Sequence, residues 1–378
     1  MYLLEHDAKQ LLARHGVPVP DACLLTNAAA ANVLPPGPWM VKGQITAGGR
    51  GKAGLIQKAA TAAKVRAVAA KILGTQIRGR TVRAVRIEQQ VHGAGEAYIS
   101  LVLDPDTAGV RIIMSAQGGM DVETLPSVAL HTASAAPDTA ALAAAAEQLA
   151  ASFSGATGKA LAEAGRLLAA AFMAEEALLI EINPLFVRPD GTWIAGDAKI
   201  VTDDSALPRQ SGQRALLDNT TCPYQEAALK DAHGCDYVVV DPAGEIALLT
   251  TGAGLSMMLI DEMRGAGLKP YNFLDIRTGG LRGEITRLVN VLQWMREGPQ
   301  VRILLINIFA GITELGEFSR LLVRALKAVP EFKVPVVARL VGNGMETART
   351  VLADAGITLH DDLDAALAEV RRHLENRK

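Results

Sequence analysis

The expected order of strands and helices changes near residue 235, and this change limits the possible folds more than any other feature of the sequence. Before it, segments rich in β-branched residues are joined in pairs by short turns, which is typical of antiparallel hairpins in an α+β domain. After it, strands and helices alternate, which is typical of a parallel, doubly wound α/β sheet. Residues 217–234 are polar and turn-rich and predict a linker. We therefore expect two domains, residues 1–220 and residues 235–378.

The charge balance limits the kind of partner that this chain can bind. Lys and Arg number 38 against 40 Asp and Glu, a formal net charge of -2, so no overall basic field exists to hold a nucleic acid or an anionic membrane. The first residues lack the pattern of a secretory signal, and the longest apolar runs are far below the roughly 20 residues that span a bilayer. We therefore expect a cytoplasmic protein without nucleic-acid or membrane partners, in which any polyanion site is local.

A glycine-rich stretch at residues 47–54, AGGRGKAG, lies between two expected strands and so at the tip of a hairpin. The backbone N–H groups of such a tip can close over a polyphosphate, and Lys42 and Arg50 supply cations to neutralise it. The stretch is not a Walker A loop, because Ala53 follows Lys52 where that motif needs Ser or Thr. The pattern predicts a phosphate-binding hairpin, and a solvated flexible turn is the alternative.

Polar side chains interrupt the apolar strand expected over residues 177–187. Glu181 and Asn183 lie two residues apart and therefore on one face of the strand, where burial is costly without a cation or hydrogen-bond partners. Asp197, on the next expected strand at residues 192–200, can return to the same face. Hard oxygen ligands of this kind, together with nucleotide phosphates, suit Mg²⁺. A hydrogen-bonded structural pair is the alternative.

Two strand-to-helix turns in the second half contain glycine. Residues 252–257 form the first, but Met257 stands where a dinucleotide fingerprint has Gly or Ala, which argues against NAD. The second passes through Gly311 into a helix expected from about Ile312, whose N–H groups and positive dipole end would point above the sheet. Two such helix starts predict an edge that receives anions.

Taken in order, these segments give the chain a resemblance to the β subunit of succinyl-CoA synthetase (succinate–CoA ligase) and its relatives, including malate–CoA ligase. The resemblance implies an N-terminal ATP-grasp domain over residues 1–220 and a flavodoxin-like, parallel α/β CoA-ligase domain over residues 235–378. It covers the whole chain and rests on residues 5–20, 41–54, 179–185, 252–257, 272–275, 307–312 and 334–343, which stand in the family's order and spacing.

The resemblance also implies an activity. The chain would be the β subunit of an ADP-forming carboxylate–CoA ligase and would bind ATP, or GTP, with Mg²⁺. A partner α subunit, in an αβ or α2β2 assembly, would bind CoA and carry a histidine that ATP phosphorylates. The phosphoryl group would pass to a succinate-like di-acid, and the CoA thiol would attack the resulting acyl phosphate.

Matching positions give this chain a set of expected site residues. The set comprises Lys42, Gly49, Arg50 and Gly51 for the phosphates; Glu88 and Val91 for the hinge and base; Glu96 as an acidic nucleotide contact; Glu181 as the catalytic acid that steadies the phosphohistidine; Asn183 and Asp197 for the metal; and Gly311, Ile312 and Thr313 for the substrate carboxylate.

Departures from the family pattern fall on the side that binds the acid. Thr251 stands where the family has Asn, Arg277 lies in what is otherwise a run of glycines, and Thr313 and Glu314 replace a more neutral or basic sequence. We hypothesise an acid other than succinate alone, such as malate or a sulfonated or bulkier acid, with Thr251 near it and Arg277 paired to an extra anionic group through its forked donors. A surface arginine in a drifted loop is the alternative.

Two other functions compete with this one. A self-contained ATP-grasp ligase that joins a carboxylate to an amine is disfavoured, because the second half brings no nucleophile of its own. A non-catalytic ATP-binding regulatory paralogue is disfavoured, because Lys42, Glu181, Asn183 and Asp197 are all present. The chain's histidines are scattered along the sequence, so we expect none of them to be the nucleophile.

Overall fold

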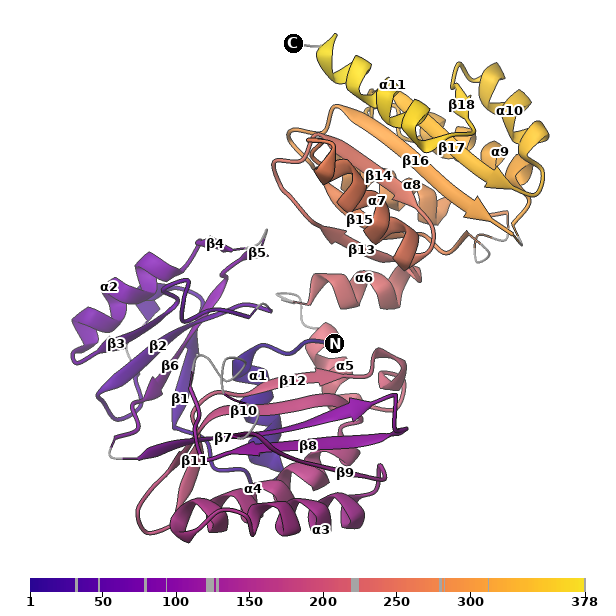
Figure 1. Ribbon diagram of the computed structural model, residues 1–378. Coiled ribbons are helices and arrows are strands. Elements are labelled where there is room, and N and C mark those ends of the chain that lie inside the picture. Colours follow the sequence, from indigo (N-terminus) through magenta and orange to yellow (C-terminus); the bar gives the residue numbers. More distant parts are fainter. Residues whose placement is uncertain are drawn as a thin grey trace. The chain divides into compact units, whose positions relative to one another are not determined.

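The computed structural model describes residues 1–30, 33–46, 48–77, 80–92, 94–119, 126, 129–218, 224–278, 281, 283–311 and 313–376. The chain divides into two compact units, Met1–Tyr224 and Gln225–Lys378 (Figure 1). Along the described parts of the chain, every helix is too short or too polar to span a bilayer.

The first unit contains a sheet that carries the glycine-rich hairpin. Its strands are, in spatial order, β1 (Ala22–Leu25), β6 (Ala84–Gln89), β2 (Trp39–Gln44) and β3 (Ile56–Ala59). β2 and β3 form the predicted antiparallel hairpin, with Lys42 opposite Ile56. Helix α2 (Ala62–Ile72) covers the sheet, because its apolar residues at helical spacing, among them Val65 and Val68, are buried against it. A single strand over residues 81–91 was expected, which is wrong at its start, where β5 (Arg80–Thr81) pairs with β4 (Gln76–Ile77).

A second sheet of the first unit carries the expected metal ligands. Its strands are, in spatial order, β11 (Trp193–Ala195), β10 (Ala177–Val187), β7 (Gly95–Asp104), β8 (Gly109–Ser115) and β9 (His131–Ala135), and β12 (Lys199–Thr202) also pairs with β10. All these pairings are antiparallel. Helices α3 (Thr139–Ala150) and α4 (Gly155–Ala174) cover one face (Figure 1). Their Ala-rich sequence allows close approach, since a Cβ on Gly165 would lie 2.5 Å from the Cβ of Ala146.

The strand expected over residues 192–200 is split into β11 and β12 by residues 196–198. β10 pairs with β12 up to Glu181 and with β11 from Leu185, and between these positions Pro184 has no N–H to give to the ladder. Asp197 therefore lies in an interruption of the sheet and not on a strand. The prediction that it lies on a strand is wrong for this reason.

The remaining elements of the first unit lie outside these two sheets. Helix α1 (Glu5–Arg14) buries Ala8, Leu11 and Leu12, and with them two charged residues that belong to the site. The others are η1 (Ala28–Ala30), η4 (Asp204–Ala206) and α5 (Ser211–Leu217).

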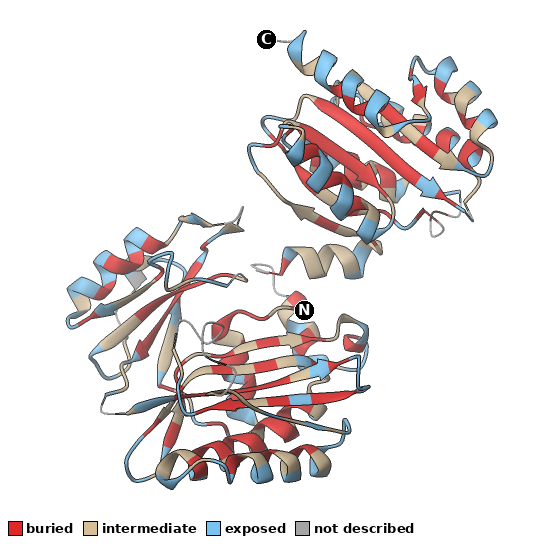
Figure 2. Cartoon of the chain, in the orientation of Figure 1, coloured by how far each residue is buried: buried red, intermediate tan, exposed pale blue. Residues whose placement is uncertain are grey.

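The second unit is built on parallel strands with helices between them. It contains α6 (Gln225–His233), β13 (Asp236–Val239), β14 (Ile246–Thr250), α7 (Ala253–Gly265), β15 (Asn272–Asp275), α8 (Thr286–Arg296), β16 (Ile303–Ala310), α9 (Leu315–Ala328), β17 (Val336–Gly342), α10 (Met345–Asp354), β18 (Leu359–His360) and α11 (Leu363–Glu375). β14, β16, β17 and β18 are parallel neighbours in that order. Figure 2 shows β14 and β16 buried along almost their whole length, as expected for a parallel sheet covered on both faces.

β15 lies on the other side of β14, and a side chain completes their junction. The Asn272 amide accepts a hydrogen bond from the N–H of Leu248 and donates one to its carbonyl, both at 2.9 Å. Backbone hydrogen bonds from Tyr271 to Ile246 and from Ile276 to Thr250 flank this contact. The spatial order β15-β14-β16-β17-β18 is the flavodoxin-like order, which confirms the predicted fold class.

Two expectations for the start of the second unit are corrected. β13 was expected among the parallel strands, but it pairs antiparallel with β15, because the short connection to β14 leaves no room for a crossover. Helix α6 occupies part of the predicted linker, since its Gln, Glu, Ala, Leu and Lys residues favour a helix. Residues 219–223 of that linker lie outside the described residues.

Candidate functional site

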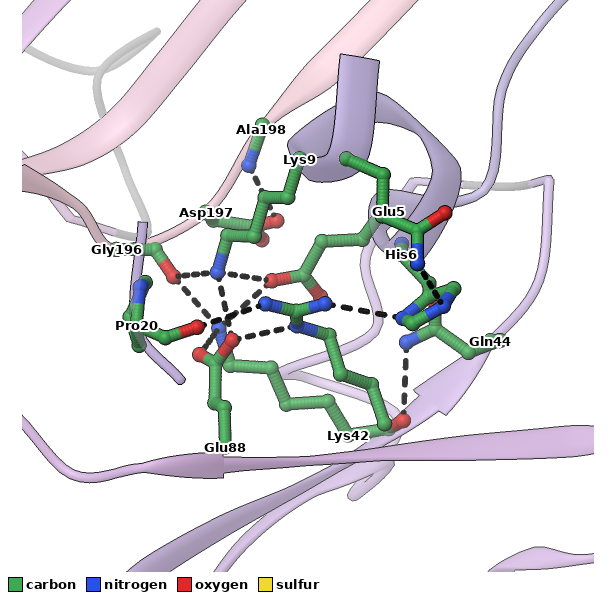
Figure 3. A network of polar contacts seen from close by, with 12 residues as sticks. Glu5, His6, Lys9, Pro20, Lys42, Gln44, Glu88, Gly196, Asp197 and Ala198 are labelled. Atoms are coloured by element: carbon green, nitrogen blue, oxygen red, sulfur yellow. Dashed lines mark hydrogen bonds and ion pairs between the residues drawn. The ribbon is translucent and has the colours of Figure 1, made fainter. Parts of the chain in front are cut away.

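Lys42, the expected phosphate-binding lysine, is buried and already paired. Its Nζ lies 2.8 Å from Oε1 of Glu5 and 2.6 Å from Oε1 of Glu88, and it donates a hydrogen bond of 2.6 Å to the carbonyl of Gly196. Only 5% of Lys42 is exposed. Figure 3 shows these groups converging from separate segments of the first unit. A phosphate that binds here would therefore contact a lysine whose ammonium group these partners already fix in position.

Lys9 makes the same contacts from the opposite direction. Its Nζ lies 2.8 Å from Oε1 of Glu5 and 2.8 Å from Oε2 of Glu88, and Lys9 has no exposed surface. Glu5 and Lys9 are one turn apart on α1, on the same face as Ala8 and Leu12. Sequence reasoning did not assign either residue to the site. The available signal was two charged residues on the apolar face of an amphipathic helix, where burial requires partners.

Arg50 connects the hairpin tip to the interrupted sheet. Its Nη1 lies 2.6 Å from Oε2 of Glu5, and its Nη2 donates to both carboxylate oxygens of Asp197 at 2.7 Å. The tip folds back through a hydrogen bond from the Ala53 N–H to the Gly49 carbonyl, and Gly49 has a φ of +82°, which favours glycine. The structure thus brings together Lys42, Arg50 and Asp197, as the sequence predicted, but the expected metal ligand is bound to the expected phosphate-binding arginine.

The residues that these ion pairs connect form what we call the buried charge network, which consists of Glu5, Lys9, Lys42, Arg50, Arg86, Glu88 and Asp197. Burial alone would raise the pKa of Glu5, but the charges of Lys42, Lys9 and Arg50 hold that pKa well below its usual value. Burial lowers the pKa of Lys9, whereas for Lys42 the carboxylates of Glu5 and Glu88 outweigh burial and raise the pKa. Positive charge exceeds negative charge among its members, which suits an anion.

Glu88 takes a role that the sequence did not predict. Its carboxylate contacts Lys9, Lys42 and the guanidinium of Arg86, at 2.7 Å from Nε, and 2% of the residue is exposed. The side chain is therefore paired within the network, and its expected contact with the hinge or base stays a prediction. Val91 is half-buried in the segment that follows β6.

Asn183 and Asp197 lie opposite each other across the interruption of the sheet. The register pairs Leu185 with Ala195 and Glu181 with Lys199, and the interruption lies between these pairs. Within the described ranges, His, Cys, Asp and Glu form no group of three that could hold a metal ion. An amide oxygen and a carboxylate fit Mg²⁺, which takes one or two protein ligands and fills its other positions with phosphate and water.

The loop after β8 brings Glu96 close to Asn183. The Gly119 N–H donates to Oδ1 of Asn183 at 2.7 Å, and the Gly118 N–H donates to the Glu96 carbonyl at 3.0 Å. Gly119 has a φ of +112°, which favours glycine, and a Cβ there would lie 2.9 Å from Oε2 of Glu96. The exposed Glu96 and the half-buried Asn183 therefore border the same region of the second sheet.

Tyr2 is a further residue near the expected metal ligands. Burial raises the pKa of its hydroxyl, the charge of Arg50 lowers it, and the charges of Asp197 and Glu181 raise it again. Tyr2 and the half-buried Glu181 therefore lie close enough to this end of the site to act on it electrostatically. No sequence motif pointed to Tyr2.

In the second unit, the predicted glycine turns meet at one edge. β14 and β16 are adjacent and parallel, so the segments that follow Thr250 and Ala310 lie together at their carboxyl ends, where flavodoxin-like folds bind ligands. Thr251 and Gly311 begin these segments. The Thr313 hydroxyl lies 3.0 Å from that of Thr278 and links two loops. Ile312 lies outside the described residues.

The helix expected from about Ile312, whose N-terminus was expected to receive an anion, begins later, and its first N–H groups are bound within the chain. The helix begins at Leu315, and the Glu314 carboxylate accepts hydrogen bonds from the N–H groups of Gly316, at 3.1 Å, and Glu317, at 2.6 Å. The chain thus caps this helix with its own carboxylate. By contrast, residues 252–254 at the start of α7 are exposed, and Gly252 at the N-cap has no side chain to cap the helix, but its own N–H donates to Oδ1 of Asp275 at 2.9 Å.

Arg277 has a partner within its own unit. Its Nη2 lies 2.6 Å from Oδ2 of Asp236 on β13, and half of its side chain is exposed. Its φ of +51° favours glycine, in keeping with the glycine run that the family has at this position. A role in substrate binding would require the guanidinium to leave Asp236.

Comparison with known proteins agrees with both units. A family model described as an ATP-grasp domain matches residues 2–187, and one described as CoA-ligase matches residues 249–372. The succinate–CoA ligase [ADP-forming] β subunit of Chloroflexus aurantiacus is 37% identical over 99% of this chain and 100% of its own length. That of a Roseiflexus species is 35% identical over 94% of this chain and 95% of its own.

A solved structure extends the likeness to the fold. ATP citrate lyase from Methanothrix soehngenii, determined with citrate and coenzyme A, superposes with a TM-score of 0.68 over 95% of each chain at 18% identity. At that identity the match concerns the fold alone. The identities of 37% and 35% to these β subunits, over 99% and 94% of this chain, confirm the resemblance that the sequence motifs indicate. The chain belongs to the family of succinate–CoA ligase [ADP-forming] β subunits.

Proposed function

We propose that this chain uses Mg-ATP to phosphorylate a histidine of a partner α subunit, as the β subunit of an ADP-forming ligase that joins a succinate-like di-acid to CoA. The observation that carries the proposal is the convergence of Lys42, Arg50 and Asp197, from separate segments of the ATP-grasp unit, at one site with surplus positive charge. Family membership supplies the reaction class.

The residues of this chain position and neutralise phosphates and supply no covalent chemistry. Phosphoryl transfer depends mainly on positioning and on neutralising charge. Lys42, Arg50 and the hairpin amides bind the phosphates in this proposal. Asn183 and Asp197 hold Mg²⁺, which would neutralise charge on the phosphates when bound.

The phosphorylated histidine belongs to the partner in this proposal. His6 lies beside the network, but its Nδ1 accepts a hydrogen bond of 3.0 Å from Arg86, which only donates, and burial together with the Arg86 charge lowers its pKa. A neutral histidine held in this way is structural. Glu181, near the nucleotide end of the site, is proposed to steady the partner's phosphohistidine. CoA binds mainly to the partner.

The acid is proposed to bind at the edge formed by Thr251, Gly311 and Thr313. The exposed start of α7 offers N–H groups and a positive dipole end to a carboxylate or to the travelling phosphoryl group. Glu314 makes the neighbouring start of α9 unavailable to a second anion. We therefore place the carboxylate that reacts near α7.

The test is to express this chain with an α-type chain of the same family. Thioester formation from ATP, CoA and succinate, malate or a sulfonated acid is measured together with the nucleotide product. We expect acyl-CoA and ADP only when both chains are present. Thioester formation by this chain alone, or AMP as the product, would contradict the proposal.

A further inference from the structure

The contact between Arg50 and Asp197 concerns the two residues that we assign to different ligands. Nη2 of Arg50 donates to both oxygens of the Asp197 carboxylate at 2.7 Å. A divalent cation and a guanidinium compete for the same carboxylate oxygens, because both bind through positive charge. The Asp197 carboxylate is therefore satisfied by the guanidinium of Arg50.

Glu5 holds Arg50 independently of Asp197. Its Oε2 lies 2.6 Å from Nη1 of Arg50, and its Oε1 lies 2.8 Å from each of Lys9 and Lys42. Only 1% of the Glu5 side chain is exposed, and it sits on a helix packed in the interior. If Arg50 leaves Asp197, it keeps one charged partner, and its freed nitrogen can turn to a different anion.

From this geometry we propose that Arg50 occupies the cation position on Asp197 while the nucleotide site is empty, with Glu5 as its fixed point. Nucleotide phosphates draw Nη2 away and open Asp197 to a divalent cation, so the cation binds after or together with the nucleotide. The proposal rests on the proposed function, because it takes Asp197 as the metal ligand. Glu5 is in this sense a positioning residue.

The exchange leaves no buried charge unpaired, which is why it is physically accessible. Removing one partner from a buried ion pair is strongly destabilising because it leaves an uncompensated charge. Here a phosphate oxygen replaces Asp197 on Arg50, and the cation replaces Arg50 on Asp197. Lys9, which has no exposed surface, stays with Glu5 and Glu88 in both states.

The experiment measures Mn²⁺ binding to the full chain by counting free Mn²⁺ with electron paramagnetic resonance, with and without ADP. For the wild type we expect ADP to tighten Mn²⁺ binding at least about fivefold, the lower end of typical coupling between two ligands. Arg50→Gln should bind Mn²⁺ without nucleotide at least about fivefold more tightly than the wild type. Arg50→Gln with Asp197→Asn should lose that gain.

Arg86→Gln is the matched control. It removes the same charge from the same network, but Arg86 contacts Glu88, His6 and the Pro20 carbonyl and leaves Asp197 covered by Arg50. Its Mn²⁺ affinity without nucleotide should stay at the wild-type value. Equal tightening in Arg50→Gln and Arg86→Gln would show a general charge effect and overturn the proposal.

A second variant covers the case in which Arg86→Gln does not fold. Arg50→Lys keeps the positive charge, but its single ammonium does not reproduce the contact with both Glu5 and Asp197, so Mn²⁺ should bind more tightly than to the wild type. Wild-type affinity in Arg50→Gln or Arg50→Lys would refute the exchange. If ADP fails to promote Mn²⁺ binding even in the wild type, the metal role of the proposed function itself is wrong.

Discussion

The groups that we propose to bind anions in the first unit and the helix start of α9 in the second are both balanced by carboxylates of the chain, but these carboxylates come from different distances in the sequence. Arg50 is held by Glu5 and Asp197, which lie far from it in the sequence. The N-terminus of α9 is held by Glu314, the residue directly before the helix. The pairing of Arg50 depends on the fold of the whole first unit, whereas the pairing at the start of α9 depends on a local helix cap.

This difference indicates where a change in a site residue should also change the stability of the fold. In the buried charge network, every member is held by groups from other segments, so a change at one position disturbs both the site and the interior. At the start of α9, a change affects the hydrogen bonds of one helix end. Changes in the first unit should therefore have larger effects than changes of similar chemistry in the second.

Glu5→Gln tests the coupling most strongly. It leaves Lys9, Lys42 and Arg50 buried with too little negative charge, and breaking a buried ion pair costs about 3–5 kcal/mol. Urea unfolding of the full chain should show a loss of this size in the free energy of unfolding. Glu147→Gln, on the exposed side of α3, should change it by less than about 0.5 kcal/mol. Equal losses in the two variants would remove the distinction between the regions.

Asp197→Ala should remove function with a smaller effect on the fold. Transfer of phosphate from Mg-ATP to the partner should fall by about 100-fold or more, in line with the loss of a group that orients a metal site. The matched control is Asp190→Ala in the exposed turn between β10 and β11, which should keep the wild-type rate. A wild-type rate in Asp197→Ala would contradict the metal role.

Glu314→Ala should have a local effect. Loss of the N-cap hydrogen bonds to Gly316 and Glu317 should lower the free energy of unfolding by about 1 kcal/mol. Glu314→Ser keeps a capping oxygen without the charge and should stay within about 0.5 kcal/mol of the wild type. If the alanine variant lost as much stability as Glu5→Gln, the cap would not be local.

The smallest effect is expected from pH at Glu369 on α11. Burial alone would raise its pKa, but the hydrogen bond from His360 and the charge of Arg372 lower the pKa overall. The ionised form is therefore favoured in the native state, and its stabilisation is present above the usual pKa of a glutamate and is lost as pH falls toward the lowered value. Glu369→Gln should flatten the acid limb of a stability–pH curve by a few tenths of a kcal/mol, since the site is near the surface. An unchanged acid limb would show that Glu369 makes no such contribution to stability.

Local patterns predicted most of the elements, because hydrophobic period and turn residues act over short distances. The strand over residues 177–187 is present with those bounds, and the hairpin around Gly49 forms as expected. The flavodoxin-like order came from the family resemblance, since strand order depends on contacts that no local pattern contains. The split between β11 and β12 was missed, because it depends on Pro184 of the neighbouring strand β10, which cannot donate to the ladder.

The candidate site was predicted in part. The sequence identified Lys42, Arg50 and Asp197 by motif, but not their burial in one network, because the partners on α1 reach them only through tertiary packing. The role of Glu314 was open to local reasoning, since an acidic residue before a helix is a known cap. The family pattern drew attention instead to Gly311 and to an open helix start.

The most direct measurement follows the γ-phosphate of labelled ATP in a mixture of this chain and its α-type partner. We predict ADP as the product and base-stable label on a histidine of the partner, with no label on this chain. With the Asp197→Ala variant we predict no label on the partner. Label on a residue of this chain, or consumption of ATP to AMP without a labelled partner, would contradict these predictions.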